Sequence, residues 1–321
     1  PHTRPFMSHT RLLVLPAAAA VLSAPVVCAT DYNVDTQAAF DALNSTNFEP
    51  GDRILLQSGM TFTGSLNFEA EDSGTVLDPI VITSSGAERA TLAPGDGIGI
   101  RVYNAGGFVI RNLRLVGSGV AEDGTTTSTR PGISFFADSP GSIKYPLVHL
   151  DQLEVTGFGN RGVVVGGFNA STGYDDVRIT NVVAHGNLRS GIETYGFTDV
   201  SNALTSVYVG HCRSFHNVGS PAREAHGIVL GGVDGGVVER CLAYDNGQNN
   251  RSLGIWAYTS TNLTIQFNES YSNKTAGEIG GVGFAFDQGV TNSVIQYNYS
   301  HDNDGAGYLQ FGGFGPKANS G

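Results

Sequence analysis

The segment GIVLGGVDGGVVERCLAYDN, residues 227–246, is one unit of a pattern that recurs through most of the chain. It begins with a glycine followed by an apolar residue, continues into the apolar pair Val237-Val238, and closes on Asn246. Short runs with alternating apolar positions are typical of β-strands that bury one side. Strands this short cannot bury a core alone, so the unit requires copies of itself on either side.

The glycine-apolar start recurs at intervals of 24 to 36 residues. The starts are Gly97-Ile98, Gly132-Ile133, Gly162-Val163, Gly191-Ile192, Gly227-Ile228, Gly254-Ile255, Gly283-Phe284 and Gly307-Tyr308. The closing asparagines are Asn187, Asn217, Asn246, Asn273 and Asn303. Stacked units pair their backbone groups with the units above and below, about 4.8 Å away, and asparagine suits the bends between strands. Unequal unit lengths favour this stack over a β-sandwich or a propeller. We therefore predict an all-β parallel solenoid of about eight to ten coils.

Both ends of the repeat carry their own signals. Residues Thr36–Leu43 have an amphipathic pattern, which predicts a short N-terminal helix that caps the first coil and protects its edge. The chain stops at Gly321, soon after the start at Gly307, so we expect a solenoid that is truncated at its C-terminus.

The N-terminal residues are typical of an export signal. Arg11 supplies a positive charge, Leu12–Val27 is an apolar run, and Val27–Ala29 is a small-residue cleavage site. The apolar run is too short to span a membrane comfortably, so we expect no stable membrane insertion. We predict that residues 1–29 are upstream residues and a signal peptide, and that residues 30–321 are a single secreted domain, extracellular or periplasmic.

The composition excludes some partners and leaves others open. With 18 basic and 29 acidic residues the formal charge is −11, and the sequence contains no basic cluster of the kind that tracks phosphates. We therefore expect no nucleic-acid partner. An acidic protein repels an acidic polysaccharide unless a cation bridges them or a local basic pocket exists, so the charge of a ligand stays open. The oligomeric state stays open as well.

The chain resembles a known superfamily over about residues 31–321. The Pro-Gly-Asp-x-Ile motif at Pro50–Ile54, the glycine starts and the closing asparagines are similar to the pectate-lyase-like superfamily of right-handed parallel β-helices. The segment Thr291–Tyr308 resembles bacterial secreted proteins described only as right-handed parallel β-helix (PbH1) repeat proteins. The resemblance implies a right-handed parallel β-helix. It does not fix a reaction, because this fold carries lyases, hydrolases, epimerases and non-catalytic adhesins.

One face of the predicted solenoid suits a sugar. In each start strand the residue after glycine points inward and the next points outward. Exposed aromatic rings can stack on sugar faces, and carboxylates accept hydrogen bonds from sugar hydroxyls. We predict a glycan-binding groove along this face, walled by the polar bends 121–131, 218–226 and 247–253. The outward residues are Glu193, Tyr195, Trp256, Tyr258, Asp287 and, in the last coil, Leu309 or its neighbours Tyr308 and Gln310.

The densest polar cluster combines Asp287 with His301–Asp304. Two functions compete for it, and ordinary bend composition would also explain it. Asp287, Asp302 and Asp304 could hold Ca²⁺, which lyases of the resembled superfamily use to neutralise a uronate carboxylate. Two carboxylates could instead act as acid and base in glycoside hydrolysis. No organic cofactor is expected.

The base of a lyase reaction has three candidates. His226-Gly227 resembles part of the polygalacturonase Gly-His-Gly segment, but the double aspartate expected one coil earlier is absent, so polygalacturonase chemistry is not expected. Lys274, in an insertion before the Asp287 strand, is the best lysine base, and Arg223 is the alternative beside Glu224 and His226.

Cys212 and Cys241 each precede a closing asparagine by five residues, so they should share one column on adjacent coils. Neighbouring strands bring such Cα atoms within disulfide distance, and an exported protein meets oxidising conditions. We predict that the two cysteines form a disulfide rather than remain as two stacked free thiols.

These observations support two hypotheses. The first is a secreted carbohydrate-active enzyme, a lyase or a glycoside hydrolase, that cleaves an extracellular polysaccharide in the groove. The second is a non-catalytic cell-surface or carbohydrate-binding solenoid.

Overall fold

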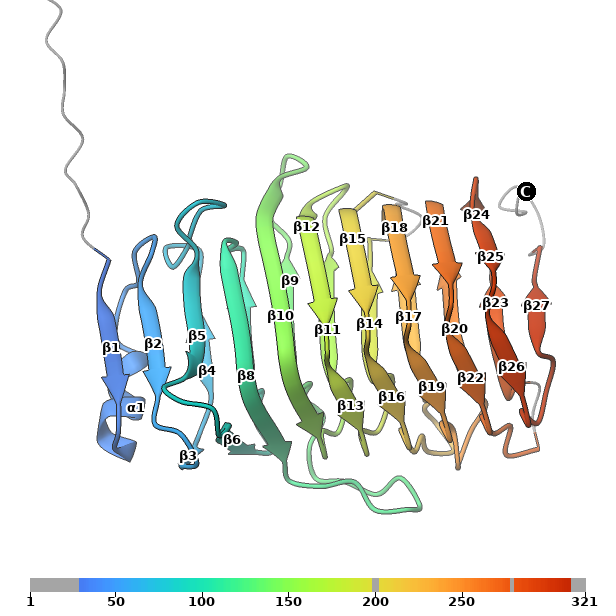
Figure 1. Cartoon of the computed structure of the whole chain (residues 1–321), viewed down its shortest axis with the longest axis horizontal. Coiled ribbons are helices and arrows are strands. Elements are labelled where there is room, and N and C mark those ends of the chain that lie inside the picture. Colours follow the sequence, from blue (N-terminus) through green and yellow to red (C-terminus); the bar gives the residue numbers. More distant parts are fainter. Residues whose placement is uncertain (1–28, 198–201, 278–279, 313–321) are drawn as a thin grey trace, which may run out of the picture.

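The computed structural model of the chain describes residues 29–197, 202–277 and 280–312 as an elongated stack of coils (Figure 1). Its strands pair in parallel from coil to coil, so the prediction of an all-β parallel solenoid is confirmed. The expected signal peptide lies almost entirely outside the described residues. Among the described residues, no helix is long and apolar enough to cross a membrane.

The glycine starts open the strands of one sheet, here called the restart sheet, which has nine strands within the described residues. They are β4 (Leu66–Phe68), β7 (Ile100–Tyr103), β9 (Ile133–Ala137), β11 (Val163–Gly167), β14 (Ile192–Tyr195), β17 (Ile228–Gly231), β20 (Leu253–Tyr258), β23 (Val282–Phe286) and β27 (Tyr308–Gln310). The register stacks the residue after each glycine in one inward column. From Leu66 to Phe284 each side chain of that column is at most 1% exposed.

The remaining strands wrap the other sides of every coil and form the broad sheet, with 18 strands in the described part of the chain. The first nine are β1 (Asp31–Val34), β2 (Arg53–Leu56), β3 (Thr61–Thr63), β5 (Ile80–Ser84), β6 (Ala90–Gly95), β8 (Phe108–Gly117), β10 (Lys144–Thr156), β12 (Gly173–Thr180) and β13 (Val183–His185). The others are β15 (Leu204–Gly210), β16 (Arg213–Phe215), β18 (Val233–Glu239), β19 (Leu242–Tyr244), β21 (Ser260–Gln266), β22 (Glu269–Tyr271), β24 (Val290–Thr291), β25 (Val294–Gln296) and β26 (Tyr299–His301).

One predicted start is wrong by two residues. The register pairs Ile100, not Ile98, with Ile133 of the next coil, so the second strand of the restart sheet, β7, begins after Gly99. Gly97 and Gly99 are each followed by isoleucine, so both fit the pattern. Only the pairing of the strand with its neighbour shows which glycine precedes it. The coil before it starts at Leu66 without a glycine.

The closing asparagines form a largely buried hydrogen-bonded ladder along the stack. The amide nitrogen of Asn217 donates to Asn246 Oδ1 at 2.8 Å, and Asn246 donates to Asn273 at 2.9 Å. Asn187 and Asn303 extend the ladder at its two ends, at 3.2 and 2.9 Å. Each rung satisfies a buried amide that a coil could not satisfy alone.

The predicted helix is present at the N-terminal end of the stack. Helix α1 spans Gln37–Leu43, and Thr36 caps it by accepting a hydrogen bond from the backbone of Ala39. Phe40 and Leu43 are buried, and the Phe40 ring stacks on Phe62 with centroids 5.2 Å apart. The helix therefore covers one end of the core beside β1 and β3 (Figure 1).

The predicted disulfide is wrong in this structure, although the two cysteines share a column. Cys212 and Cys241 are buried free thiols, and the backbone N–H of Cys212 contacts Cys241 Sγ at 3.4 Å. Each thiol points toward a carbonyl of the preceding coil, Ile179 for Cys212 and Val209 for Cys241.

Candidate functional site

The outward face of the restart sheet carries most of the predicted site residues. The register places Glu193, Trp256 and Leu309 in one outward column, and Tyr195 and Tyr258 two residues further along their strands. The column is closed at Glu193, which is only 6% exposed, and open at Leu309, which is 37% exposed.

Glu193 is held by an arginine of the preceding coil. Arg161 Nη2 donates to Glu193 Oε1 at 2.5 Å, and their side chains are 20% and 8% exposed. Burial by itself raises the pKa of Glu193, but the charge and hydrogen bond of Arg161 outweigh burial and lower this pKa. Glu193 is therefore an anion at neutral pH. The pair lines a hollow of about 530 Å³ together with Tyr195, Tyr258 and Phe168.

The two tyrosines lie flat because glycines leave room for them. A Cβ on Gly166 would lie 2.4 Å from the Tyr195 ring, and a Cβ on Gly231 would lie 2.3 Å from the Tyr258 ring. Burial raises the pKa of Tyr195, and burial together with the charge of Glu193 raises the pKa of Tyr258 to about 12. Both phenols keep their protons at neutral pH.

A second charged assembly lies beside Trp256. Glu224 accepts hydrogen bonds from His226 Nε2 at 3.2 Å and from the Arg251 guanidinium. The bond from His226 and then those from Arg251 lower the pKa of Glu224 to about 2, although burial opposes them. His226 Nδ1 accepts the backbone N–H of Leu253 at 3.1 Å, so both ring nitrogens are occupied. This occupation does not favour the predicted role of His226 as a base.

Asp287 lies in the adjoining hollow of about 280 Å³, with Glu224, Arg251 and Trp256. Its Oδ1 accepts the backbone N–H of Gln288 at 2.7 Å. Among the described carboxylates that line these hollows, Asp287 alone makes no ion pair with a cation.

A row of arginines lies beside this face, and of its members only Arg223 was predicted from the sequence. Five successive coils carry one arginine in the bend before the restart strand: Arg130, Arg161, Arg189, Arg223 and Arg251. They are about thirty residues apart in sequence, so no local cluster reveals them. Neighbouring coils stack about 4.8 Å apart, so the five coils that carry these arginines span about 19 Å along the axis. One arginine per coil, between one and four residues before the glycine, is the signal that could have found the row.

Arg189 lies at the centre of this row. Burial lowers its pKa, and the nearby positive charge of Arg161 lowers it further, while Arg223 also contributes. The Nε atoms of Arg161 and Arg189 and the indole nitrogen of Trp256 are buried without hydrogen-bond partners in the protein. Unsatisfied buried donors are rare, and their concentration here supports a functional role for this face.

The predicted walls also lie where expected. Pro131, Glu224, and Arg251 with Leu253 come from the three polar bends and line the hollows of this face. The first bend reaches several coils along the stack, as Figure 1 shows for the loop between β8 and β9.

His216 of the stack contacts Glu122 of this bend. Glu122 Oε1 lies 3.2 Å from His216 Nε2, and Asp245 Oδ2 lies 2.9 Å from His216 Nδ1. Burial lowers the pKa of His216, but hydrogen bonds to Asp245 and Glu122 outweigh burial and raise this pKa.

Several predicted residues lie elsewhere. Lys274 Nζ is 4.0 Å from Asp304, beside the asparagine ladder and outside the hollows of this face. Asp302 accepts from His301 at 2.8 Å. Tyr308 belongs to the inward column, where its ring stacks on Phe284, because the residue after glycine points inward.

The proposed calcium ligands therefore do not converge. Among the described residues, no three His, Cys, Asp or Glu side chains gather as a metal site requires, and Asp287 lies in a different hollow from the Asp304 pair. A Ca²⁺ ion takes six to eight oxygen ligands, so these residues do not fit the ion.

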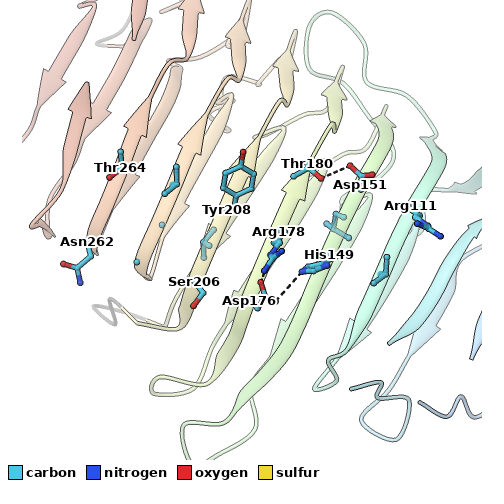
Figure 2. Close-up of a pocket in the computed structure, with 16 residues that line it drawn as sticks. Arg111, His149, Asp151, Asp176, Arg178, Thr180, Ser206, Tyr208, Asn262 and Thr264 are labelled. Atoms are coloured by element: carbon cyan, nitrogen blue, oxygen red, sulfur yellow. Dashed lines mark hydrogen bonds and ion pairs between the residues drawn. The ribbon is translucent and has the colours of Figure 1, made fainter. Parts of the chain in front are cut away.

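A larger hollow of about 1010 Å³ lies on the broad sheet (Figure 2). Two of its charged groups pair with one another, Arg178 with Asp176 at 2.8 Å, and Asp151 accepts hydrogen bonds from neutral side chains. Volume alone does not identify a reactive site. The restart face holds the buried Arg161–Glu193 pair, the strongly lowered pKa of Glu224 and three unsatisfied donors, so we take it as the candidate active site.

Comparisons with known proteins identify the fold and no closer relationship. The sequence matches no protein-family model, and a search of curated proteins finds no match. The structure is similar to tailspike protein 2 from Escherichia coli O157:H7 bacteriophage CAB120, with a TM-score of 0.51 and 15% identity over 92% of this chain and 41% of that chain.

It is also similar to a rhamnogalacturonan lyase, with a TM-score of 0.50 and 13% identity over 82% of this chain and 74% of the other. A GH136 lacto-N-biosidase from Eubacterium ramulus matches with a TM-score of 0.49 and 14% identity, over 91% and 67% of the two chains. At these identities the first two likenesses establish the β-helix fold alone.

Proposed function

We propose that this chain is an exported carbohydrate-active β-helix protein that binds an acidic polysaccharide along the arginine row and cleaves it by β-elimination. The single observation that carries the proposal is the row itself, which crosses the restart face beside flat aromatic rings. The fold, shared with a protein named rhamnogalacturonan lyase, is compatible with it.

Local charge supports an acidic ligand. Arg161, Arg189, Arg223 and Arg251 outnumber the carboxylates of the face, Glu193, Glu224 and Asp287, in a chain whose formal charge is −11. Two of the glutamates hold arginines in fixed orientations. A polymer with one anionic group every sugar or two would meet successive cations along the row.

The protonation states favour elimination over hydrolysis. Glycoside hydrolysis needs a protonated carboxyl group as acid, but Glu193 and Glu224 both have lowered pKa values. Elimination needs a base, a cation near the uronate carboxylate and a proton donor. Asp287 with Arg251 lines one hollow, and the protonated Tyr258 lies 5.3 Å from Trp256 of that hollow, measured between ring centroids.

The proposed reaction uses these groups in order. Asp287 accepts the proton from the carbon next to the uronate carboxylate, and Arg251 stabilises the negative charge that develops there. The bond to the leaving sugar oxygen then breaks, a carbon–carbon double bond forms, and Tyr258 donates a proton to the leaving oxygen.

The test uses the full chain with polygalacturonate, alginate and rhamnogalacturonan, and with neutral xylan as a control, each with and without added Ca²⁺. Cleavage is followed by absorbance of unsaturated ends and by reducing ends, and binding by mobility in gels that contain each polysaccharide. We expect unsaturated ends from one acidic polymer and none from xylan. Reducing ends without unsaturated ends would indicate hydrolysis and would contradict elimination.

Two variants test the assigned residues. Arg223→Gln should weaken binding of the acidic polymer, whereas Arg240→Gln, the same change at an exposed position on another side of the coil, should not. Asp287→Asn should abolish cleavage while binding remains. Binding without cleavage in the unaltered protein would support the alternative, a non-catalytic carbohydrate-binding solenoid.

A further inference from the structure

The broad sheet contains a second groove, built by a bend that five successive coils repeat. Leu147, Asp176, Ser206, Gly235 and Asn262 occupy equivalent positions on successive strands, and each has a positive φ between 53° and 77°. A left-handed residue at the same place in each coil turns every strand in the same direction. The hollow of about 1010 Å³ is lined by residues of this column and of the strands beside it.

The groove runs along the axis of the solenoid. Its lining residues come from six neighbouring strands, β8, β10, β12, β15, β18 and β21 (Figure 2). Five steps of about 4.8 Å make it about 24 Å long. Its shape therefore suits an extended chain rather than a compact small molecule.

Its charges cancel. Arg111 and Arg178 oppose Asp151 and Asp176, and burial lowers the pKa of His149, so this imidazole is neutral at neutral pH. Asp176 pairs with Arg178 at 2.8 Å. The groove therefore offers no net charge to a ligand, in contrast to the arginine row of the restart face.

Asp151 is also occupied, since it accepts hydrogen bonds from Thr180 and Asn181, both at 2.7 Å. These bonds outweigh burial and lower the pKa of Asp151, which is therefore an anion at neutral pH. No free carboxylic acid is available here for proton transfer, so the groove suits binding rather than catalysis.

An aromatic platform lies in the middle of the groove. The Tyr208 ring occupies the space beside Gly210, where a Cβ would lie 2.5 Å from its ring atoms, and Tyr208 Oη donates to Glu239 at 3.1 Å. Figure 2 shows this ring between the charged residues and Thr264. A partly exposed ring fixed in this way can stack on the apolar face of a sugar. Ser206, Asn262 and Thr264 supply neutral polar groups for its hydroxyls.

We propose that this groove binds an extended neutral glycan, at a site separate from the arginine row. Cancelled charge, axial length and a single aromatic platform flanked by hydroxyl and amide groups together favour a neutral, hydroxyl-rich polymer over a polyuronate. The proposal does not depend on cleavage at the restart face. A neutral-glycan site would hold the protein on a mixed polysaccharide material while the other face engages its acidic component.

The test is titration calorimetry of the full chain with three neutral hexasaccharides, cellohexaose, xylohexaose and mannohexaose, and with hexagalacturonate. We expect at least one neutral hexasaccharide to bind, and Tyr208→Ala to weaken its binding about two- to twelvefold, which corresponds to a stacking contact of about 0.5–1.5 kcal/mol. Gly210→Ala keeps the tyrosine but forces its ring to move, so it should produce a similar loss.

Trp256→Ala, on the other face, is the matched control and should leave neutral-glycan binding unchanged. The proposal is overturned when no neutral hexasaccharide binds at millimolar concentration, or when binding depends on Trp256 and not on Tyr208 and Gly210. Circular dichroism of each variant verifies its fold. Cleavage of an acidic polymer that persists in Tyr208→Ala would show that the proposed function stands independently of this site.

Discussion

Removal of Glu193 tests whether the restart face is built around a buried ion pair. Arg161 and Glu193 are 20% and 8% exposed in their side chains and 2.5 Å apart. Glu193→Met leaves the Arg161 charge buried without its partner, and breaking such a pair typically costs about 3–5 kcal/mol. Arg161→Met leaves the carboxylate unpaired and should cost a similar amount. The double variant replaces both charges with apolar side chains and should recover most of the loss.

The assay is urea unfolding at pH 7, followed by circular dichroism and by the fluorescence of Trp256, the single tryptophan of the chain. Trp256 lies two coils beyond Glu193 on the same face, so its signal reports local loosening that global unfolding would miss. This matters because stacked repeats can unfold in parts. Urea is preferred to guanidinium because a salt would screen the charges under test.

The pH dependence gives a second readout. Because the folded pKa of Glu193 is lowered, its contribution to stability is present above the unfolded pKa, about 4.3, and is lost as the pH falls through the folded pKa. The unaltered protein should lose this contribution in acid, whereas Glu193→Met should not. A double variant as unstable as the sum of the single variants would refute the reasoning, because it would show no coupling between the two groups.

Three further predictions concern the asparagine ladder, the contact between Glu122 and His216, and the glycine beside Tyr258. Asn246→Ala removes a rung of the buried ladder and should lower the free energy of unfolding by about 2–4 kcal/mol, measured in urea, since its neighbours keep unsatisfied amide groups. A loss below about 1 kcal/mol would contradict the ladder's role. The contact of Glu122 with His216 should be complete below about pH 6.5 and weaken as the pH rises through the raised pKa of His216. Hydrogen exchange of residues 121–127 should report this change, and Glu122→Gln should diminish it. Gly231→Ala should displace the Tyr258 ring and weaken acidic-glycan binding about three- to tenfold at nearly unchanged stability, and unaltered binding would exclude Tyr258 as a platform.

The sequence predicts the fold well because its strongest signals are local. A glycine followed by an apolar residue marks one strand, and a closing asparagine marks one bend. Each coil can therefore be recognised from its own residues. The register of Glu193, Trp256 and Tyr258 follows from the two-residue period of a strand. Where two glycines fit equally, at Gly97 and Gly99, the local signal fails, because only pairing with Ile133 decides between them.

The sequence predicts the candidate site only in part, because ion pairs join residues of different coils. Arg161 lies 32 positions before Glu193, and Arg251 lies 27 positions after Glu224. Neither pairing follows from a local motif, and bend lengths vary, so the arginine row has no constant period. Asp302 and Asp304 are adjacent to Asp287 in coil order, yet their side chains engage His301 and Lys274 instead.

The two proposed grooves show why columns, rather than motifs, carry function in this molecule. A coil repeats its backbone every 4.8 Å or so, but the side chain at each position is free to change from coil to coil. On the restart face an arginine is repeated in successive bends, so positive charge accumulates along the axis. In the groove around Tyr208 arginines and aspartates alternate with neutral residues, so charge cancels over the same distance. Because the scaffold is the same on both faces, a difference in ligand charge must come from this choice of side chains alone. If hexagalacturonate bound in the groove around Tyr208 and a neutral hexasaccharide bound on the restart face, both proposed sites would therefore be wrong.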